Sequence, residues 1–204
     1  MKKKFLNNSL DIIKKNNPQI TSDNIDVIRY GLEALYMSVT KVTIILLLAF
    51  ILGVIKETIM IMIFFNIIRS VAFGMHASKS IHCYIMSTAF FIGGAYLGMY
   101  INVNIIVKLI VCLLVLIIIM KYAPADTIKR PIINKKRRMV YKVLSTSFAL
   151  ILIIISIIFK DYNISNYIII GVTEAAIMIH PLTYKLFKLP YNNYKKYNYG
   201  LISN

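Results

Sequence analysis

Long apolar runs constrain this chain more than any other feature of its sequence. There are six, at about residues 34–55, 58–75, 83–100, 103–121, 142–159 and 164–183. A helix needs about 17–25 mostly apolar residues to cross a bilayer. Hydrophobic residues make up 58% of the chain, above the roughly 45–50% that is usual in soluble domains. The sequence therefore predicts an all-α membrane protein with about six transmembrane helices, forming a single polytopic domain over residues 1–204.

The stretch before these runs has a different pattern. Within residues 1–16, apolar side chains recur on one helical face and lysines lie at both ends, as in helices that lie on a membrane surface. The Asn-Asn-Pro sequence at 16–18 ends this helix, and Asp23 is a candidate N-cap for the next one. We therefore expect residues 1–30 to form an N-terminal interfacial helix and further cytoplasmic helical structure.

Charge predicts how the chain is oriented. The net charge is +16, and the basic residues gather before the first run, in residues 121–142 and in the tail. Basic connections usually stay in the cytoplasm. We therefore expect a multi-pass plasma-membrane protein with both termini cytoplasmic, a basic cytoplasmic loop at 122–141 and a C-terminal tail at 188–204. Cations placed between apolar runs favour the lipid bilayer and acidic peptides as partners, not nucleic acid. A homodimer is compatible with the sequence.

The connection between the second and third runs holds the residues best suited to chemistry. It contains His76 and Cys83, and we expect it on the cytoplasmic side. A cysteine attacks as thiolate, and a histidine in hydrogen-bond reach can take its proton. On one straight helix these residues would stand about 10.5 Å apart along the axis, so catalysis requires a turn between them, which Gly74, Ala77, Ser78 and Ser80 permit. The competing interpretation is that Cys83 is a small buried hydrophobe, as we expect for Cys112.

Arg69 lies near the end of the second run, and its position there allows two interpretations. Its guanidinium could reach the headgroups, or it could bind a carboxylate of a substrate or of the protein. Neither a metal nor a cofactor is expected. Asp126 lies in a Pro-Ala-Asp-Thr turn, where a carboxylate ordinarily caps backbone N–H groups.

Three motifs together make the chain resemble the accessory gene regulator protein B (AgrB) family of Gram-positive quorum-sensing systems. They are Tyr30-Gly31-Leu32-Glu33, Arg69 with Gly74-x-His76-Ala77 and Cys83, and Tyr122-Ala-Pro124-Ala-Asp126 running to Lys129-Arg130-Pro131-Ile132. A Cys–His pair alone would be a weak signal, whereas this combination over nearly the whole chain is specific.

The resemblance implies an activity. Members of this family are membrane cysteine endopeptidases that act on a short AgrD-like propeptide and promote its cyclisation to a thiolactone. Carried onto this sequence, the resemblance makes Cys83 the nucleophile and His76 the general acid and base. The basic loop then has a candidate role in holding the acidic propeptide tail, with Lys129 and Arg130 as the expected contacts and Arg69 as a third substrate-binding residue.

Two other kinds of function remain to be weighed. A small peptide or ion transporter without covalent chemistry would use Arg69, Lys108 and Glu174 to line a path, but the sequence shows no inverted repeat. A scaffold that recruits acidic partners to the membrane would work without Cys83. Loss of function on removal of the thiol separates the peptidase from both.

Overall fold

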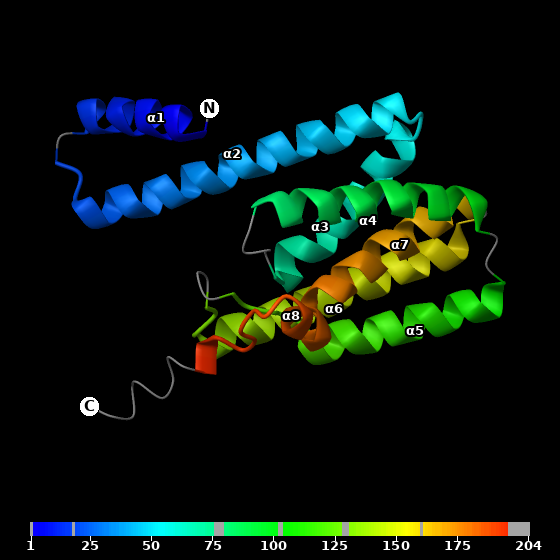
Figure 1. The fold of residues 1–204 in the computed structure, drawn as a ribbon. Helices are drawn as coiled ribbons and strands as arrows, with labels where there is room; N and C mark the ends of the chain where they lie inside the picture. Colours follow the sequence, from blue (N-terminus) through cyan, green and yellow to red (C-terminus); the bar gives the residue numbers. More distant parts are fainter. Residues whose placement is uncertain are drawn as a thin grey trace. The chain divides into compact units, whose positions relative to one another are not determined.

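The computed structural model describes residues 2–17, 19–75, 80–101, 104–127, 131–159 and 161–195, with side chains at all of these positions except 22, 23, 80–83 and 162. This part of the chain forms eight helices (Figure 1). They are α1 (Lys2–Asn16), α2 (Ser22–Ile51), α3 (Ile55–Ala72), α4 (Ser80–Tyr100), α5 (Ile105–Tyr122), α6 (Lys135–Ile158), α7 (Tyr162–Ile179) and α8 (Pro181–Leu186). The prediction of an all-α protein is confirmed.

The chain divides into two compact units, Met1–Leu48 and Ala49–Asn204. In the first, α1 lies against the N-terminal part of α2. The ring of Phe5 packs on Tyr36 with 5.4 Å between centroids, and Lys2 forms an ion pair with Glu33. Leu6 and Leu10, from the apolar face predicted for α1, are buried.

In the second unit, α7 contacts α3, α4, α5 and α6. Glycines allow these close approaches, as is common between helices in membranes. A Cβ on Gly171 would lie 2.9 Å from the carbonyl oxygen of Ile61 on α3, and a Cβ on Gly98 would lie 2.5 Å from the ring of Tyr167. The buried core of this unit includes Ile68, Ala72, Val115, Ile119, Ala149, Ile168, Val172, Ala175, Ala176, Ile179 and Tyr184.

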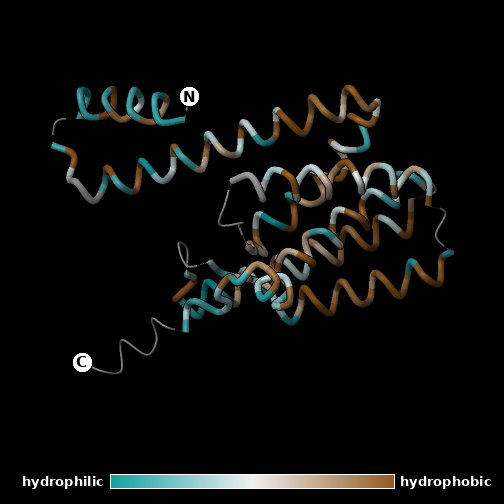
Figure 2. Tube along the Cα trace, viewed as in Figure 1, coloured by the Kyte–Doolittle hydropathy of each residue, from teal (hydrophilic) through white to brown (hydrophobic). Residues whose placement is uncertain are grey.

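Several helices are apolar on the surfaces that the protein leaves uncovered. Figure 2 shows almost continuous hydrophobic colouring along α5 and along much of α6. Within the described residues, three helices are long and apolar enough to cross a membrane, at Asn24–Ile51, Ile105–Tyr122 and Lys135–Ile158, and Asn163–Ile179 is a shorter apolar helix. Exposed apolar surface of this extent is that of an integral membrane protein.

The helix ends differ in places from those expected. α2 begins at Ser22, next to the predicted N-cap Asp23, and its polar N-terminal part leads into the apolar run that was expected from about residue 34. The last predicted span, 164–183, is interrupted: α7 ends at Ile179 and Pro181 begins α8. His180 caps α8 by accepting a hydrogen bond from the backbone N–H of Leu182 at 3.2 Å. α6 begins at Lys135, so the last residues of the predicted basic loop at 122–141 are helical.

Candidate functional site

The C-terminal end of α3 is organised around Arg69. Its guanidinium donates hydrogen bonds to three successive carbonyl oxygens, those of Phe73 at 2.6 Å, Gly74 at 3.3 Å and Met75. Phe73 and Gly74 both have positive φ values, 56° and 116°. A Cβ on Gly74 would lie 2.9 Å from the carbonyl oxygen of Met178, so this position requires glycine for both conformation and space. Arg69 thus holds a left-handed turn directly before His76.

This turn is also bound to two other parts of the chain. The backbone N–H of Gly74 donates to Ala125 O at 2.9 Å, and that of Ala125 donates to Ala72 O at 2.9 Å. The N–H of Met75 donates to Met178 O at 3.2 Å, near the end of α7. We call residues 69–75, with Ala125 and Met178, the arginine hub. The hub joins the ends of α3, α5 and α7 through backbone hydrogen bonds.

Asp126 connects the C-terminal segment to this hub. Its side chain is only 4% exposed, and its carboxylate accepts from the backbone N–H groups of Asn193 at 2.9 Å and Tyr194 at 2.7 Å. The hydroxyl of Tyr184 donates to Asp126 O at 3.1 Å. Asp126 does cap backbone N–H groups, but those groups lie far along the chain. Sequence reasoning missed this contact, since no local pattern indicates it.

Aromatic side chains cover the same region. Burial raises the pKa of Tyr184 and raises that of Tyr191 to about 12. The two rings meet edge to face at 5.1 Å, and the guanidinium of Arg138 lies over the ring of Tyr194. These contacts tie α6, α8 and the C-terminal segment together beside Asp126.

The residues predicted to act on a substrate are only partly described. His76, Lys129 and Arg130 lie outside the described residues. Cys83 lies in the first turn of α4, which begins at Ser80, and its side chain is not described. The first turn of a helix carries exposed N–H groups that favour a thiolate. The approach of His76 to Cys83 stays a prediction.

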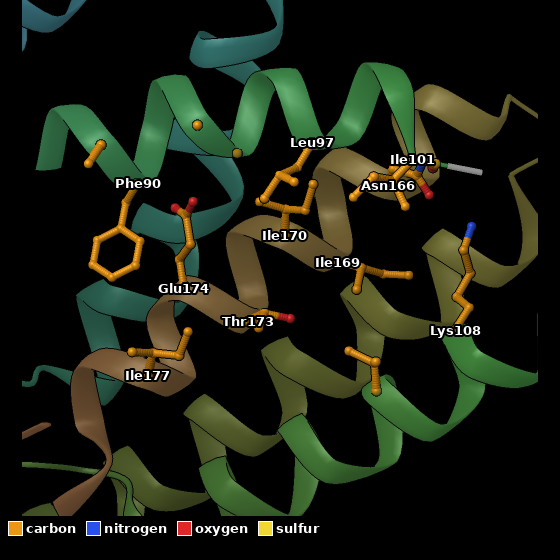
Figure 3. A pocket seen from close by; sticks show the side chains of 14 residues that line it. Phe90, Leu97, Ile101, Lys108, Asn166, Ile169, Ile170, Thr173, Glu174 and Ile177 are labelled. Atoms are coloured by element: carbon orange, nitrogen blue, oxygen red, sulfur yellow. The ribbon is translucent and has the colours of Figure 1, made fainter. Parts of the chain in front are cut away.

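The other cysteine and the other charged candidates are described. Cys112 is buried in α5 with a free thiol, in agreement with a packing role. Lys108 and Glu174 line a cavity of about 370 Å³ formed by α4, α5 and α7 (Figure 3). Lys108 donates to the hydroxyl of Ser165 at 2.8 Å. Within the residues that the structure describes, no group of three or more His, Cys, Asp and Glu side chains could hold a metal ion.

The structure thus defines a class, an integral membrane protein whose helix ends are joined in a partly buried polar hub, with a cysteine at the start of a neighbouring helix. Residues 6–179 match the family described as Accessory gene regulator B. The chain belongs to this family, and the resemblance drawn from its motifs is confirmed.

Relatives in several organisms support this assignment. An AgrB-like protein of Clostridium acetobutylicum is 33% identical over 185 residues, covering 90% of this chain and 88% of the relative. An AgrB-like protein of Listeria innocua is 31% identical over 83% of each chain. The accessory gene regulator protein B of Staphylococcus aureus is 32% identical over 77% of this chain and 83% of its own length. No solved structure matches this chain.

Proposed function

We propose that this chain is a membrane-embedded cysteine endopeptidase that removes the C-terminal part of a short AgrD-like propeptide and promotes its thiolactone or lactone cyclisation. The observation that carries the proposal is the family match over residues 6–179, which includes His76 and Cys83. At the level of the family, AgrB proteins are membrane peptidases of quorum-sensing systems. The proposal extends that role to this chain.

The proposed reaction has two acyl transfers. His76 takes the proton of Cys83, and the thiolate attacks a peptide carbonyl carbon. The C–N bond breaks, His76 protonates the leaving amine, and the propeptide's acyl group remains as a thioester on Cys83. A thiol or hydroxyl within the bound peptide then attacks this thioester. It gives its proton through His76 to the sulfur of Cys83, so the ring closes and the enzyme is regenerated.

Arg69 supports this reaction as a positioning residue. Its guanidinium binds the carbonyl oxygens of Phe73, Gly74 and Met75, and His76 is the next residue in the chain. An arginine with five fixed donors suits such a multiple contact, because a lysine offers only a point charge. A direct contact between Arg69 and substrate remains a prediction. Lys129 and Arg130 are the proposed contacts for the acidic tail of the propeptide.

The proposed topology has six spanning helices, α2 to α7, in one polytopic domain over residues 1–204. The distribution of Lys and Arg supports cytoplasmic positions for both termini, for the basic connection before α6 and for the start of α4. The arginine hub joins the end of α3 to the ends of α5 and α7, so it lies on the cytoplasmic side in this topology. The proposed partners are the bilayer and the propeptide, and a homodimer stays open.

The test is processing of the propeptide encoded beside the gene, co-expressed with the full chain. Mass spectrometry should detect the cyclic product and the released tail with the wild-type chain. Cys83→Ala and His76→Ala should abolish both products while the protein still inserts. Cys112→Ala is the matched control, because it removes the other thiol, which is buried in α5, and it should retain processing. Cleavage that persists in Cys83→Ala would rule the proposal out.

A transporter is the second candidate, because Lys108 and Glu174 line the same cavity. It predicts peptide or ion flux in reconstituted vesicles that survives Cys83→Ala. Arg69, the third residue of that hypothesis, donates to backbone carbonyls of the hub instead of lining this cavity. Flux without cleavage products would favour the transporter over the peptidase.

A further inference from the structure

The cavity between α4, α5 and α7 has the size and lining of a ligand site. Its volume of about 370 Å³ lies at the small end of the roughly 300–1,000 Å³ range of small-molecule sites. Its walls come from side chains such as Leu97 on α4, Val111 on α5 and Ile170 on α7, and most of its lining residues are apolar. Gly93 lies in the wall on α4, and nothing stands within 4 Å of the position where its Cβ would be. A bound backbone could therefore approach α4 closely.

Two polar side chains on the α7 side of this cavity lack hydrogen-bond partners within the described part of the protein. Glu174 is only 5% exposed, and its Oε2 is buried with no partner. The hydroxyl of the adjacent Thr173 is also buried and unpartnered. The other carboxylate oxygen, Oε1, rests against α4, where a Cβ on Gly94 would lie only 2.7 Å away. Figure 3 shows Glu174 reaching from α7 towards α4.

The two other polar side chains of the cavity wall have hydrogen-bond partners. Asn166 donates to the carbonyl oxygens of Gly98 at 3.1 Å and Ile101 at 3.0 Å, and Lys108 donates to Ser165. Leaving a buried polar group unpaired is costly, so native proteins rarely do so without a reason. An acyl chain would fill the apolar cavity but would offer Glu174 no hydrogen bond. A ligand that satisfies both features is apolar and carries an N–H donor, which describes a peptide.

The end of the cavity at which Glu174 lies faces the proposed catalytic region. Glu174 lies five residues before Ile179, about 7.5 Å from the end of α7. Met178, between them, accepts the hydrogen bond from Met75. On α4, position 83 precedes Phe90 in the cavity wall by two helical turns, about 10.5 Å along the axis. A ligand extending from the cavity towards this end therefore approaches the first turn of α4.

We infer that this cavity is a subsite for the peptide substrate and binds an apolar stretch of the propeptide inside the membrane. A backbone or side-chain N–H of that stretch donates to Glu174, and the backbone lies along Gly93. The inference rests on the proposed function, since the substrate is the propeptide of that reaction. The cavity holds a few side chains, not a whole helix, so it selects the sequence of a short segment.

The first experiment identifies the occupant by photocrosslinking in membranes that contain the full chain and the propeptide encoded beside its gene. A benzophenone amino acid replaces Leu97 in the cavity wall or, as a matched control, Leu113 on α5, which lies outside the cavity. These side chains are 53% and 59% exposed. We expect a peptide adduct at position 97 and only lipid adducts at position 113. Lipid adducts alone at both positions would overturn the inference.

The second experiment measures the effect of blocking the cavity. Gly93→Leu fills it, and Glu174→Leu removes the acceptor, so both should raise KM for the propeptide about tenfold with little change in kcat. Glu174→Gln keeps an acceptor oxygen and should restore KM to near its wild-type value. Leu113→Trp adds bulk outside the cavity and should leave KM unchanged. An unchanged KM in both Gly93→Leu and Glu174→Leu would contradict the inference.

These outcomes separate the inference from the proposed function. Processing that depends on Cys83, together with lipid adducts alone at position 97, would keep the peptidase and reject the subsite. A peptide adduct at position 97 without any cleavage in the wild-type chain would keep the subsite and reject the peptidase. The crosslinking result does not depend on the folding of the Gly93 and Glu174 variants.

Discussion

Polar groups are hydrogen-bonded within the arginine hub, whereas in the cavity at Glu174 two of them lack partners in the described structure. In the hub, the Arg69 guanidinium and the N–H groups of Gly74, Met75 and Ala125 donate to backbone carbonyls. In the cavity, Glu174 and Thr173 are buried with polar atoms that have no partner in the described structure. A saturated network holds one geometry, whereas an unsatisfied one leaves interactions available to a ligand. Positioning and binding are therefore assigned to different parts of one helix bundle.

The largest expected effect is that of Arg69→Ala. It removes the guanidinium that donates hydrogen bonds to three carbonyl oxygens in a strained turn. Charge-assisted hydrogen bonds of this kind are among the stronger ones. We expect a loss of about 2–4 kcal/mol in the free energy of unfolding and no processing of the propeptide. Thermal unfolding in nanodiscs measures the first effect, and mass spectrometry of the products measures the second.

Arg69→Lys distinguishes positioning from simple charge. A lysine keeps the positive charge but cannot reproduce the planar set of donors. If Arg69 positions the turn, Arg69→Lys should lower kcat while KM changes little. A selective rise in KM would instead support the predicted contact between Arg69 and the substrate.

Gly74→Ala should have the next largest effect. The φ of 116° is unfavourable for any residue with a Cβ, and that Cβ would lie 2.9 Å from Met178 O. We expect a loss of about 1–3 kcal/mol in stability, measured as above. Gly93→Ala is the matched control, because the same change there points into open space of the cavity. Equal destabilisation by the two substitutions would show that the arginine hub does not constrain its glycine more than the cavity wall does.

Asp126→Asn tests the link between the hub and the C-terminal segment. An amide has one acceptor oxygen where the carboxylate has two, so it loses the contact to the N–H of Asn193 or to that of Tyr194. We expect a loss of about 1 kcal/mol and faster hydrogen exchange at both amides. Exchange that remains slow at both positions would show that Asp126 does not hold this segment.

The sequence predicted the helical class, because long apolar runs and capping residues are local signals. The break between α7 and α8 at His180 and Pro181 was also predictable, since proline favours the first turn of a helix. The predicted span nevertheless continued through it, because the surrounding residues are hydrophobic. The partners of Asp126 could not be predicted, because Asn193 and Tyr194 lie 67 and 68 positions away. Motif spacing singled out Arg69 and Gly74 but did not show that the guanidinium binds backbone carbonyls.

The cavity was beyond sequence reasoning for a related reason. Glu174 stood out as an acid within an apolar run, but its surroundings depend on how α4 and α5 pack against α7. The approach of α4 depends on a glycine at position 94, whose missing Cβ makes room for Glu174 Oε1. Side-chain periodicity describes one helix at a time, whereas this cavity is formed by three helices together.

The smallest expected effect belongs to Glu174→Gln, and it is informative because it is small. Oε2 has no partner in the described structure, so an amide at this position breaks no internal hydrogen bond. We expect the free energy of unfolding to change by less than about 0.5 kcal/mol, measured in nanodiscs without propeptide. In a saturated site such as the arginine hub, a comparable substitution would break existing hydrogen bonds. A loss of about 2 kcal/mol or more would show that Glu174 has a structural partner, and the cavity would then resemble the hub.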